Sequence, residues 1–391
     1  MIRFHQMPAA LNKYKWYPPA ETMIPLISIL KSLLPANSDF NQQICSYLGV
    51  KQCILANSGR TLLTLLLQVL YKQDNKQRDE VLIPGYTCYS VAASIARAGL
   101  KIRTYDIEPE TFYPDMDSVK KNINGKILAI LSQHLFGIPI SIDELHDLAQ
   151  KNHITHIEDT AQGLGGNLLG RSLGTTGDYG LFSFGRGKPL PLGCGGALIG
   201  SDKTVMERIC AGDSTKGYKQ LAITACAKIL SHPGIYGFLE RLPLGLGQTV
   251  FYPNFSVSSM PEAVKRLGAI TLSKLNELNA HRNCIAKIYT DNLPIDRTVP
   301  VLKGSEPVYT RFPVMTARQS IPRTLRKLGV RRMYPKAITK EPAIYSYLAD
   351  RKQTMPGAMT ITQNLITLPT HSGITPEIAG KIADEISHYY L

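Results

Sequence analysis

Short apolar runs alternate with amphipathic stretches between about residues 50 and 200 of the chain. Runs rich in Val, Ile and Leu predict strands, and apolar positions at helical spacing between them predict helices. The predicted strands are residues 80–83, 101–105, 127–132, 153–157, 179–183 and 196–200, and the predicted helices are 59–72, 87–98, 115–122, 141–151 and 203–210. This alternation indicates a largely parallel sheet with helices on both faces. Ligands of such sheets gather at the carboxyl ends of the strands, where we expect Tyr86, His134 and Asp159.

The second half of the chain predicts a long helix followed by a smaller unit. Residues 261–293 carry an apolar stripe that includes Val264, Leu267 and Leu275, which predicts one continuous helix. We expect residues 1–256 to form a large ligand-binding domain, and residues 257–391 to hold the linking helix and a small C-terminal α/β domain.

Residues 220–250 form an unusually apolar segment for this position in the chain. It is interrupted by Lys228, Pro233, Glu240, Arg241 and Pro243. A membrane-spanning helix needs roughly 20 mostly apolar residues, so we do not expect one here. An insertion at a subunit interface is the favoured interpretation. The alternative is a lip that touches lipid or an apolar substrate tail, which nearby basic charge would assist.

Length, hydrophobic content and net charge indicate what kind of protein this is and which partners suit it. The chain has 391 residues, 44% of them hydrophobic, which is enough for a folded protein of two domains. Its formal net charge of +14 is compatible with no specific partner, with an anionic substrate such as a nucleotide sugar, or with peripheral contact to an anionic membrane. No motif predicts nucleic-acid binding.

The seven cysteines show neither metal-ligand spacing nor a disulfide framework, so we expect no metal site. Reduced cysteines and an N-terminus without an apolar signal core predict a cytoplasmic protein.

Asp159 and Lys188 are the candidate catalytic pair. Asp159 ends a predicted strand, and Lys188 follows in a glycine-rich loop that continues to Gly193-Cys194-Gly195-Gly196. A lysine amine can bond covalently to the aldehyde of pyridoxal phosphate, and a carboxylate can pair with the protonated pyridine nitrogen of that cofactor. Each residue alone has a common structural explanation, as a solvated loop lysine or a helix cap.

Several short motifs stand in a recognisable order along the chain. They are Ala56-Asn57-Ser58-Gly59-Arg60, Val81–Thr87, Ala96–Leu100, Tyr105-Asp106-Ile107, Gln133–Gly137, Glu158–Gln162, Phe182-Ser183-Phe184 with Lys188, and Leu368–His371. Together they resemble the DegT/DnrJ/EryC1/StrS family of sugar aminotransferases, from about residue 40 to the end of the chain.

The resemblance implies an α/β protein of the aspartate aminotransferase type (fold type I). This fold has a large domain with a mostly parallel seven-stranded sheet and a smaller C-terminal α/β domain. The resemblance also implies pyridoxal 5′-phosphate as cofactor, and a homodimer in which both subunits contribute to each site.

The resemblance further assigns roles to individual residues. Lys188 and Asp159 would be catalytic, and Gln162 would lie beside the ring oxygen of the cofactor. Ser183 would bind phosphate together with Ser58 and the amides of Gly59 and Arg60 at a helix start, a position suited to anions.

The chain departs from the family pattern at four places. Arg60 stands where threonine is usual, and we expect it to reach the phosphate rather than solvent. Cys88 replaces the aromatic residue that stacks on the cofactor, so we expect Tyr89 to stack instead, with Tyr86 the other candidate; a plain core role for both tyrosines is an equal alternative. Cys194 replaces an acidic residue and has no assigned role. Residues 257–260 lack the asparagine that relatives use for a cross-subunit contact.

His134 stays a possible site residue by resemblance, although a structural role is favoured at a strand end.

The favoured function is the transfer of an amino group from an amino acid, with glutamate the expected donor, to a keto-sugar that is linked to a nucleotide. Polysaccharide or secondary-metabolite synthesis is the typical setting. Lys188 favours amino transfer, because relatives that dehydrate sugars carry histidine there. Three alternatives stay open: a lipid- or carrier-linked keto acceptor, a non-catalytic cofactor-binding regulatory or assembly protein, and desulfuration by an activated cysteine.

Overall fold

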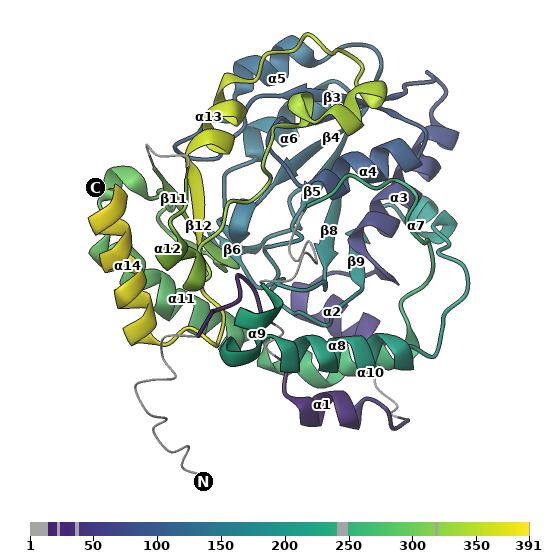
Figure 1. Cartoon of the computed structure of the whole chain (residues 1–391). Helices are drawn as coiled ribbons and strands as arrows, with labels where there is room; N and C mark the ends of the chain where they lie inside the picture. The colour runs from purple at the N-terminus through teal and green to yellow at the C-terminus, as the bar shows by residue number, and fades with distance from the viewer. Residues whose placement is uncertain (1–14, 22–23, 36–38, 241–248, 317–319, 391) are drawn as a thin grey trace.

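A seven-stranded sheet forms the centre of the molecule (Figure 1). The computed structural model describes residues 15–21, 24–35, 39–240, 249–316 and 320–390. In spatial order the strands are β1 (Cys53–Ala56), β9 (Gly196–Gly200), β8 (Tyr179–Ser183), β5 (Thr155–Asp159), β4 (Ile127–Gln133), β2 (Glu80–Pro84) and β3 (Lys101–Tyr105). Only β9 runs antiparallel to its neighbours in this sheet. The mostly parallel sheet expected from the sequence is confirmed.

Alternating side chains of the strands bury the two faces of the sheet in different clusters. Val81 and Ile83 pack with the cluster that includes Leu62 of α3 (Gly59–Gln73) and residues of α4 (Tyr89–Arg97) and α7 (Lys203–Arg208). Leu82, between them, packs on the other face with Leu145 of α6 (Asp143–Lys151) and residues of α5 (Met116–Asn122). Helices therefore cover both faces, as the period-two pattern of a buried strand requires.

The C-terminal part of the chain packs beside the large sheet. Its elements are α11 (Leu275–Asn292), β11 (Arg311–Met315), α12 (Arg323–Lys327), α13 (Pro356–Asn364), β12 (Leu365–Pro369) and α14 (Pro376–Tyr390). Strands β11 and β12 pair antiparallel, and α14 packs along α11. Short strands β6 (Asn167–Leu168), β7 (Arg171–Ser172) and β10 (Ser305–Glu306) form a third small sheet. The domain division at residue 256 stays a prediction.

The continuous helix expected over residues 261–293 is wrong in one respect. The structure has α10 (Glu262–Thr271), a 3₁₀ turn η3 (Leu272–Lys274) and then α11. The Thr271 hydroxyl donates to the Leu267 carbonyl at 2.7 Å, an arrangement that bends helices. The apolar stripe continues through the turn, which is why periodicity alone did not reveal the break.

The apolar segment 220–250 begins as two helices, α8 (Tyr218–Leu230) and α9 (Pro233–Leu239). Its part over residues 241–248 lies outside the described residues. Pro233 occupies the first turn of α9, where its missing amide costs no hydrogen bond. Among the residues described, no helix is long and apolar enough to cross a membrane.

The remaining helices lie near the N-terminus. Helix α1 (Leu26–Lys31) lies beside α8 and α10 along the lower edge of Figure 1, and α2 (Phe40–Leu48) follows it.

Candidate functional site

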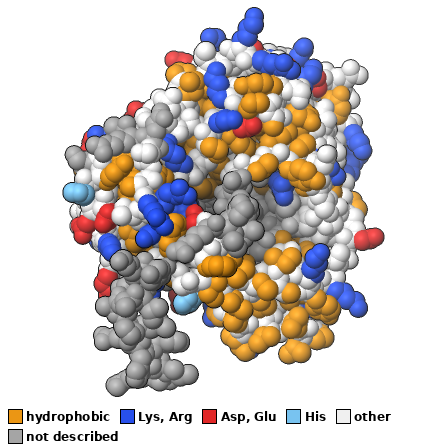
Figure 2. Space-filling view, in the orientation of Figure 1, with side chains coloured by type: hydrophobic (Ala, Val, Ile, Leu, Met, Phe, Trp, Pro, Cys, Tyr) orange, Lys and Arg blue, Asp and Glu red, His pale blue; other side chains and the backbone are white. Residues whose placement is uncertain are grey.

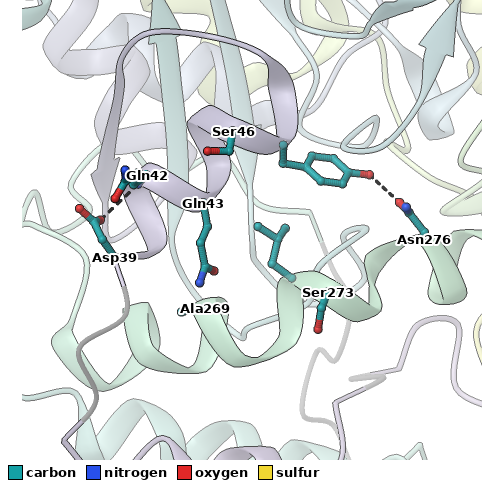
Figure 3. Close-up of a pocket in the computed structure, with 9 residues that line it drawn as sticks. Asp39, Gln42, Gln43, Ser46, Ala269, Ser273 and Asn276 are labelled. Carbon is teal, nitrogen blue, oxygen red and sulfur yellow. Dashed lines mark hydrogen bonds between the residues drawn. The ribbon is translucent and has the colours of Figure 1, made fainter.

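Two surface pockets differ in the chemical groups that line them. The larger, of about 730 Å³, lies between α2 and the α10–η3 segment (Figure 3). Two of its polar contacts serve the fold: Asp39 caps α2 through the Asn41 amide, and the Tyr47 hydroxyl donates to Asn276 at 2.7 Å. Its lining has no lysine, histidine or cysteine. This groove therefore offers no amine, imidazole or thiol for chemistry.

The second cavity, of about 470 Å³, contains Asp159 and Lys188. Asp159 is the last residue of β5, at the carboxyl end of the parallel strands. Its Oδ1 accepts a hydrogen bond from the Ala161 amide at 3.0 Å. Burial raises the pKa of Asp159, while the Ala161 amide and the charge of Lys188 act in the opposite direction. A buried carboxylate of this kind is stabilised by a cation placed beside it.

The N-terminus of α3 forms another wall of the same cavity through Ser58, Gly59 and Arg60. The Ser58 hydroxyl caps the helix by accepting from the Thr61 amide at 3.2 Å. Amides in the first turn of a helix have no intrahelical acceptor, so they and the helix dipole favour an anion here. A Cβ at Gly59 would lie 3.2 Å from the Phe182 carbonyl oxygen, which explains glycine at this close approach.

Ser183 and Arg60 complete the polar lining near the α3 N-terminus. Ser183 is the last residue of β8. The Arg60 guanidinium lies 4.7 Å from the ring centroid of Phe255, a cation–π distance, and Arg97 lies on the same ring at 5.2 Å. Arg60 thus lines the cavity and is oriented by Phe255.

Arg282 of α11 holds the loop that carries Lys188 through hydrogen bonds to its backbone. The Lys188 amide donates to the Gly185 carbonyl at 3.2 Å. The buried Arg282 guanidinium donates to the carbonyls of Lys188 and Pro189 at 3.3 and 3.0 Å. Further along the loop, Gly195 has φ +103°, which strains any other residue. These contacts hold the backbone of the lysine in one conformation.

Two predicted aromatic residues lie outside this lining. Both tyrosines are fully buried, with the Tyr86 hydroxyl donating to the Met333 carbonyl at 2.7 Å and the Tyr89 hydroxyl to the Lys336 carbonyl at 2.9 Å. The residue between the Pro84 turn and α4 that does line the cavity is Cys88.

His134 is also absent from the cavity lining, although its amide donates to the Asp159 carbonyl at 3.2 Å, and its ring contacts Glu158. Its Nε2 lies 2.9 Å from the Glu158 carboxylate, and its Nδ1 accepts from the Ile140 amide, so the ring proton is on Nε2. Glu158 also accepts from the amides of Gly174 and Thr176. Burial alone would raise the pKa of Glu158, but His134 and these amides lower it to about 2. In this structure His134 therefore orients a buried carboxylate.

Gln162 is held between two side chains of the C-terminal part. Its amide nitrogen donates to the Tyr334 hydroxyl at 3.3 Å, and its carbonyl oxygen accepts from Thr310 at 3.1 Å. Like His134, it is absent from the cavity lining, although its neighbour Ala161 is present.

The cavity also has lining residues to which the sequence assigned no role in the site. They include Asn57, Leu63, Cys88, Ser90, Val91, Ser94, Leu181, Cys194, Thr249 and Val250. Burial raises the pKa of the Cys194 thiol to about 11. A thiol with such a pKa is protonated at neutral pH, which argues against Cys194 as the activated cysteine of a desulfurase.

An amine, a buried carboxylate and a helix N-terminus thus share one cavity. These groups match the aldehyde, the pyridine nitrogen and the phosphate of pyridoxal phosphate, so the residues present fit this cofactor. Among the described residues, no group of three His, Cys, Asp or Glu side chains is placed to hold a metal ion.

Comparison with known proteins gives matches over almost the whole chain. The family model described as the DegT/DnrJ/EryC1/StrS aminotransferase family matches residues 29–387. The chain is 26% identical to the dTDP-3-amino-3,4,6-trideoxy-alpha-D-glucose transaminase of Streptomyces venezuelae, over 95% of this chain and 92% of that protein.

Solved structures share the fold. One is Helicobacter pylori PseC, an aminotransferase involved in the biosynthesis of pseudoaminic acid, with a TM-score of 0.76, 19% identity and coverage of 96% of this chain and 99% of that one. Another is the Escherichia coli GDP-4-keto-6-deoxy-D-mannose-3-dehydratase with bound hydrated pyridoxal phosphate, with a TM-score of 0.72, 18% identity and coverage of 95% and 99%. The same fold therefore supports both amino transfer and dehydration.

Proposed function

Because the chain belongs to the DegT/DnrJ/EryC1/StrS aminotransferase family, we propose that it uses pyridoxal phosphate to move an amino group from glutamate to a nucleotide-linked keto-sugar. Membership confirms the family and the enzyme class predicted from the sequence. The proposal concerns the identity of three molecules: the cofactor, the amino donor and the keto acceptor.

The observation that carries this proposal is the shared cavity of Lys188, Asp159 and the α3 N-terminus. When bound, pyridoxal phosphate supplies an aldehyde and an electron-withdrawing ring. Asp159 would hold the proton on the pyridine nitrogen, since a buried carboxylate favours a cationic neighbour. Ser58, the Gly59 and Arg60 amides and Ser183 would hold the phosphate.

Lys188 would have two tasks. Its amine would hold the aldehyde of the cofactor in the resting enzyme, and after the substrate amine displaces it, it would move a proton to or from the substrate carbon. The backbone of this residue is fixed by Arg282 and Gly185, so only the side chain needs to move between these tasks.

Sugar nucleotides are supported as acceptors by the relatives. The Streptomyces venezuelae protein is a transaminase of a dTDP-sugar, and the chain covers nearly all of its length. A formal net charge of +14 suits a substrate with a diphosphate. A homodimer with shared sites is proposed from the family pattern.

A lipid- or carrier-linked keto acceptor is the second candidate. It is favoured by the exposed apolar side chains of α8 and α9. Helix α8 contacts the loop that follows Lys188, because the Thr224 hydroxyl donates to the Leu192 carbonyl. A purely non-catalytic role is disfavoured because such a protein needs neither Asp159 nor Lys188.

The test is the visible absorption spectrum of the purified protein with pyridoxal phosphate, before and after L-glutamate. We expect a band of bound cofactor in the wild type that glutamate bleaches, no such band in Lys188→Ala, and an unchanged band in Lys126→Ala, an exposed control. A wild type without any band would overturn the proposal. A band that ignores glutamate would exclude this donor, and dTDP- and lipid-linked keto-sugars would then separate the two acceptors.

A further inference from the structure

Helices α1, α8 and α9 expose a continuous apolar face, named here the α1–α8–α9 face. More than half of the exposed large hydrophobic side chains among the described residues lie in these helices or directly beside them. They are Leu26, Ile27, Leu30, Leu33, Leu34, Tyr218, Ile223, Ile229, Leu230, Ile235 and Phe238. Single exposed apolar residues are normal on a protein surface, but a gathering of this kind marks an interaction site.

The helices are neighbours, so their apolar side chains form one surface. Helix α1 contacts α8, and α8 contacts α9. The Trp16 amide donates to the Pro233 carbonyl at 3.1 Å, which joins the segment before α1 to the start of α9. Figure 2 shows hydrophobic side chains over the lower part of the molecule, where Figure 1 places α1 and α8, with basic side chains at the edge.

Both sides of α1 are apolar. Ile29 packs in the core, whereas Ile27 and Leu30 are 58% and 59% exposed. Helix α8 shows the same pattern, with Leu221 buried and Ile223 and Ile229 each about half exposed. A helix that is apolar all round needs a second apolar environment besides the core.

Within the segments that carry this face, all the charged side chains have one sign. Residues 24–35 and 215–239 contain Lys31, Lys216, Lys219 and Lys228 and no aspartate or glutamate. Lys228 pairs with Glu21. The other three lysines are exposed and form no ion pair with another described residue.

We propose that the α1–α8–α9 face docks this protein on an anionic lipid bilayer. Apolar side chains surrounded by lysine are the composition that binds the interface of such a membrane. A second copy of the chain is a poorer occupant, because a two-fold interface would bring the same lysines against each other. The proposal does not depend on the reaction proposed above.

Docking would bring the membrane close to the candidate site. The Thr224 hydroxyl of α8 contacts the Leu192 carbonyl at 3.2 Å, in the loop between Lys188 and Cys194. A bilayer on the outer side of α8 would therefore lie about one helix diameter, roughly 10 Å, from that loop.

The experiment is flotation of the full-length protein with vesicles of phosphatidylcholine alone or mixed with phosphatidylglycerol, at low and physiological salt. We expect binding to the mixed vesicles that weakens as salt rises. Lys31→Glu with Lys219→Glu should weaken binding by more than about tenfold, since each lysine near an anionic surface contributes about fivefold. Ile27→Gln with Phe238→Gln should weaken it by about tenfold or more.

Matched controls carry the same changes elsewhere. Ile295→Gln alters a residue that is 90% exposed on another part of the surface, and Lys126→Glu alters an exposed lysine. Both should bind as the wild type does. The proposal is overturned if the wild type does not float with the mixed vesicles, or if the face variants bind as well as the controls. It is equally overturned if the face variants change only the oligomeric mass in light scattering. The cofactor band, recorded on the same samples, tests the proposed reaction separately.

Discussion

Arg282 is the residue on which the geometry of the Lys188 loop most depends. Its buried guanidinium donates to the Asn279 side chain at 2.6 Å and to the carbonyls of Lys188 and Pro189. Burial lowers the pKa of Arg282 to about 10, so it stays protonated at neutral pH. Arg282 lies 94 residues further along the chain than Lys188 and touches only the backbone of the loop in these contacts, which makes it a positioning residue for the lysine.

Replacing Arg282 with Met should loosen this loop. The two carbonyls would lose their donor inside the protein, and we expect a loss of about 2–3 kcal/mol in the free energy of unfolding, measured by urea titration. The band of bound cofactor should form more slowly than in the wild type, because the Lys188 side chain would start from several positions. Lys287→Met, an exposed change on the same helix, is the control. Equal rates of band formation in all three proteins would contradict the role given to Arg282.

The sequence predicts best those lining residues whose position depends on residues close to them in the chain. Ser58 at a helix start and Asp159 at a strand end follow from local pattern, as does Lys188 in its glycine-rich loop. Tyr89 and Gln162 are absent from the lining, and their side chains bond to Lys336 and Tyr334, partners more than a hundred residues away; their contacts with the cofactor stay predictions. Such long-range contacts leave no signal in the local sequence.

At the scale of elements, periodicity located the buried strands well. Six predicted strands correspond to β2, β3, β4, β5, β8 and β9. Strands β2 and β4 are mostly apolar runs because both of their faces are buried. Strand β1 was missed, although Cys53–Ala56 is an apolar run, since it is only four residues long. The helix break at η3 and the exposed side of α8 also escaped prediction, because both depend on packing between elements.

Helices α8 and α9 tie the N-terminal segment to the C-terminal part. Lys228 of α8 pairs with Glu21, whose carboxylate also contacts His371. After α9, Glu240 pairs with Arg331 at 2.8 Å. Both pairs are mostly buried, so removing one partner costs more free energy than at a surface ion pair.

Lys228→Met should therefore destabilise the protein, because it leaves Glu21 with one partner fewer. We expect a loss of about 1–2 kcal/mol in the free energy of unfolding. Combined with Glu21→Gln, a double-mutant cycle should give a coupling of about 1 kcal/mol. The exposed pair Lys203–Glu207, at 3.6 Å, provides the control cycle, and its coupling should stay below about 0.5 kcal/mol. Similar couplings in the two cycles would show that the contact of α8 with Glu21 does not stabilise the fold.

At the scale of the whole molecule, two buried carboxylates connect distant parts of the chain. Glu158 joins β5 to His134 and to the turn at Gly174, and Glu21 joins the N-terminal segment to α8 and to His371. Burial would raise the pKa of Glu21, but His371 and Lys228 lower it to about 2. Glu158 has the same value for the same kind of reason.

These depressed pKa values predict how stability depends on pH. In the unfolded chain a glutamate titrates near 4.5, and in the folded protein these two titrate near 2. The stabilisation is therefore complete above about pH 4.5 and is lost as pH falls towards 2, since only the unfolded chain takes up the proton in that range. Each group should contribute about 3 kcal/mol at neutral pH.

Urea titrations of the wild type at pH 7, 4 and 3 should show this loss. Glu158→Gln should be less stable than the wild type at pH 7. Its free energy of unfolding should fall less between pH 7 and pH 3, because one of the two carboxylates no longer titrates. Glu207→Gln, at an exposed pair, should leave the slope of stability against pH unchanged. A wild type whose stability stays level from pH 5 to 3 would contradict the depressed pKa values, and with them the view that these two carboxylates hold the distant segments together.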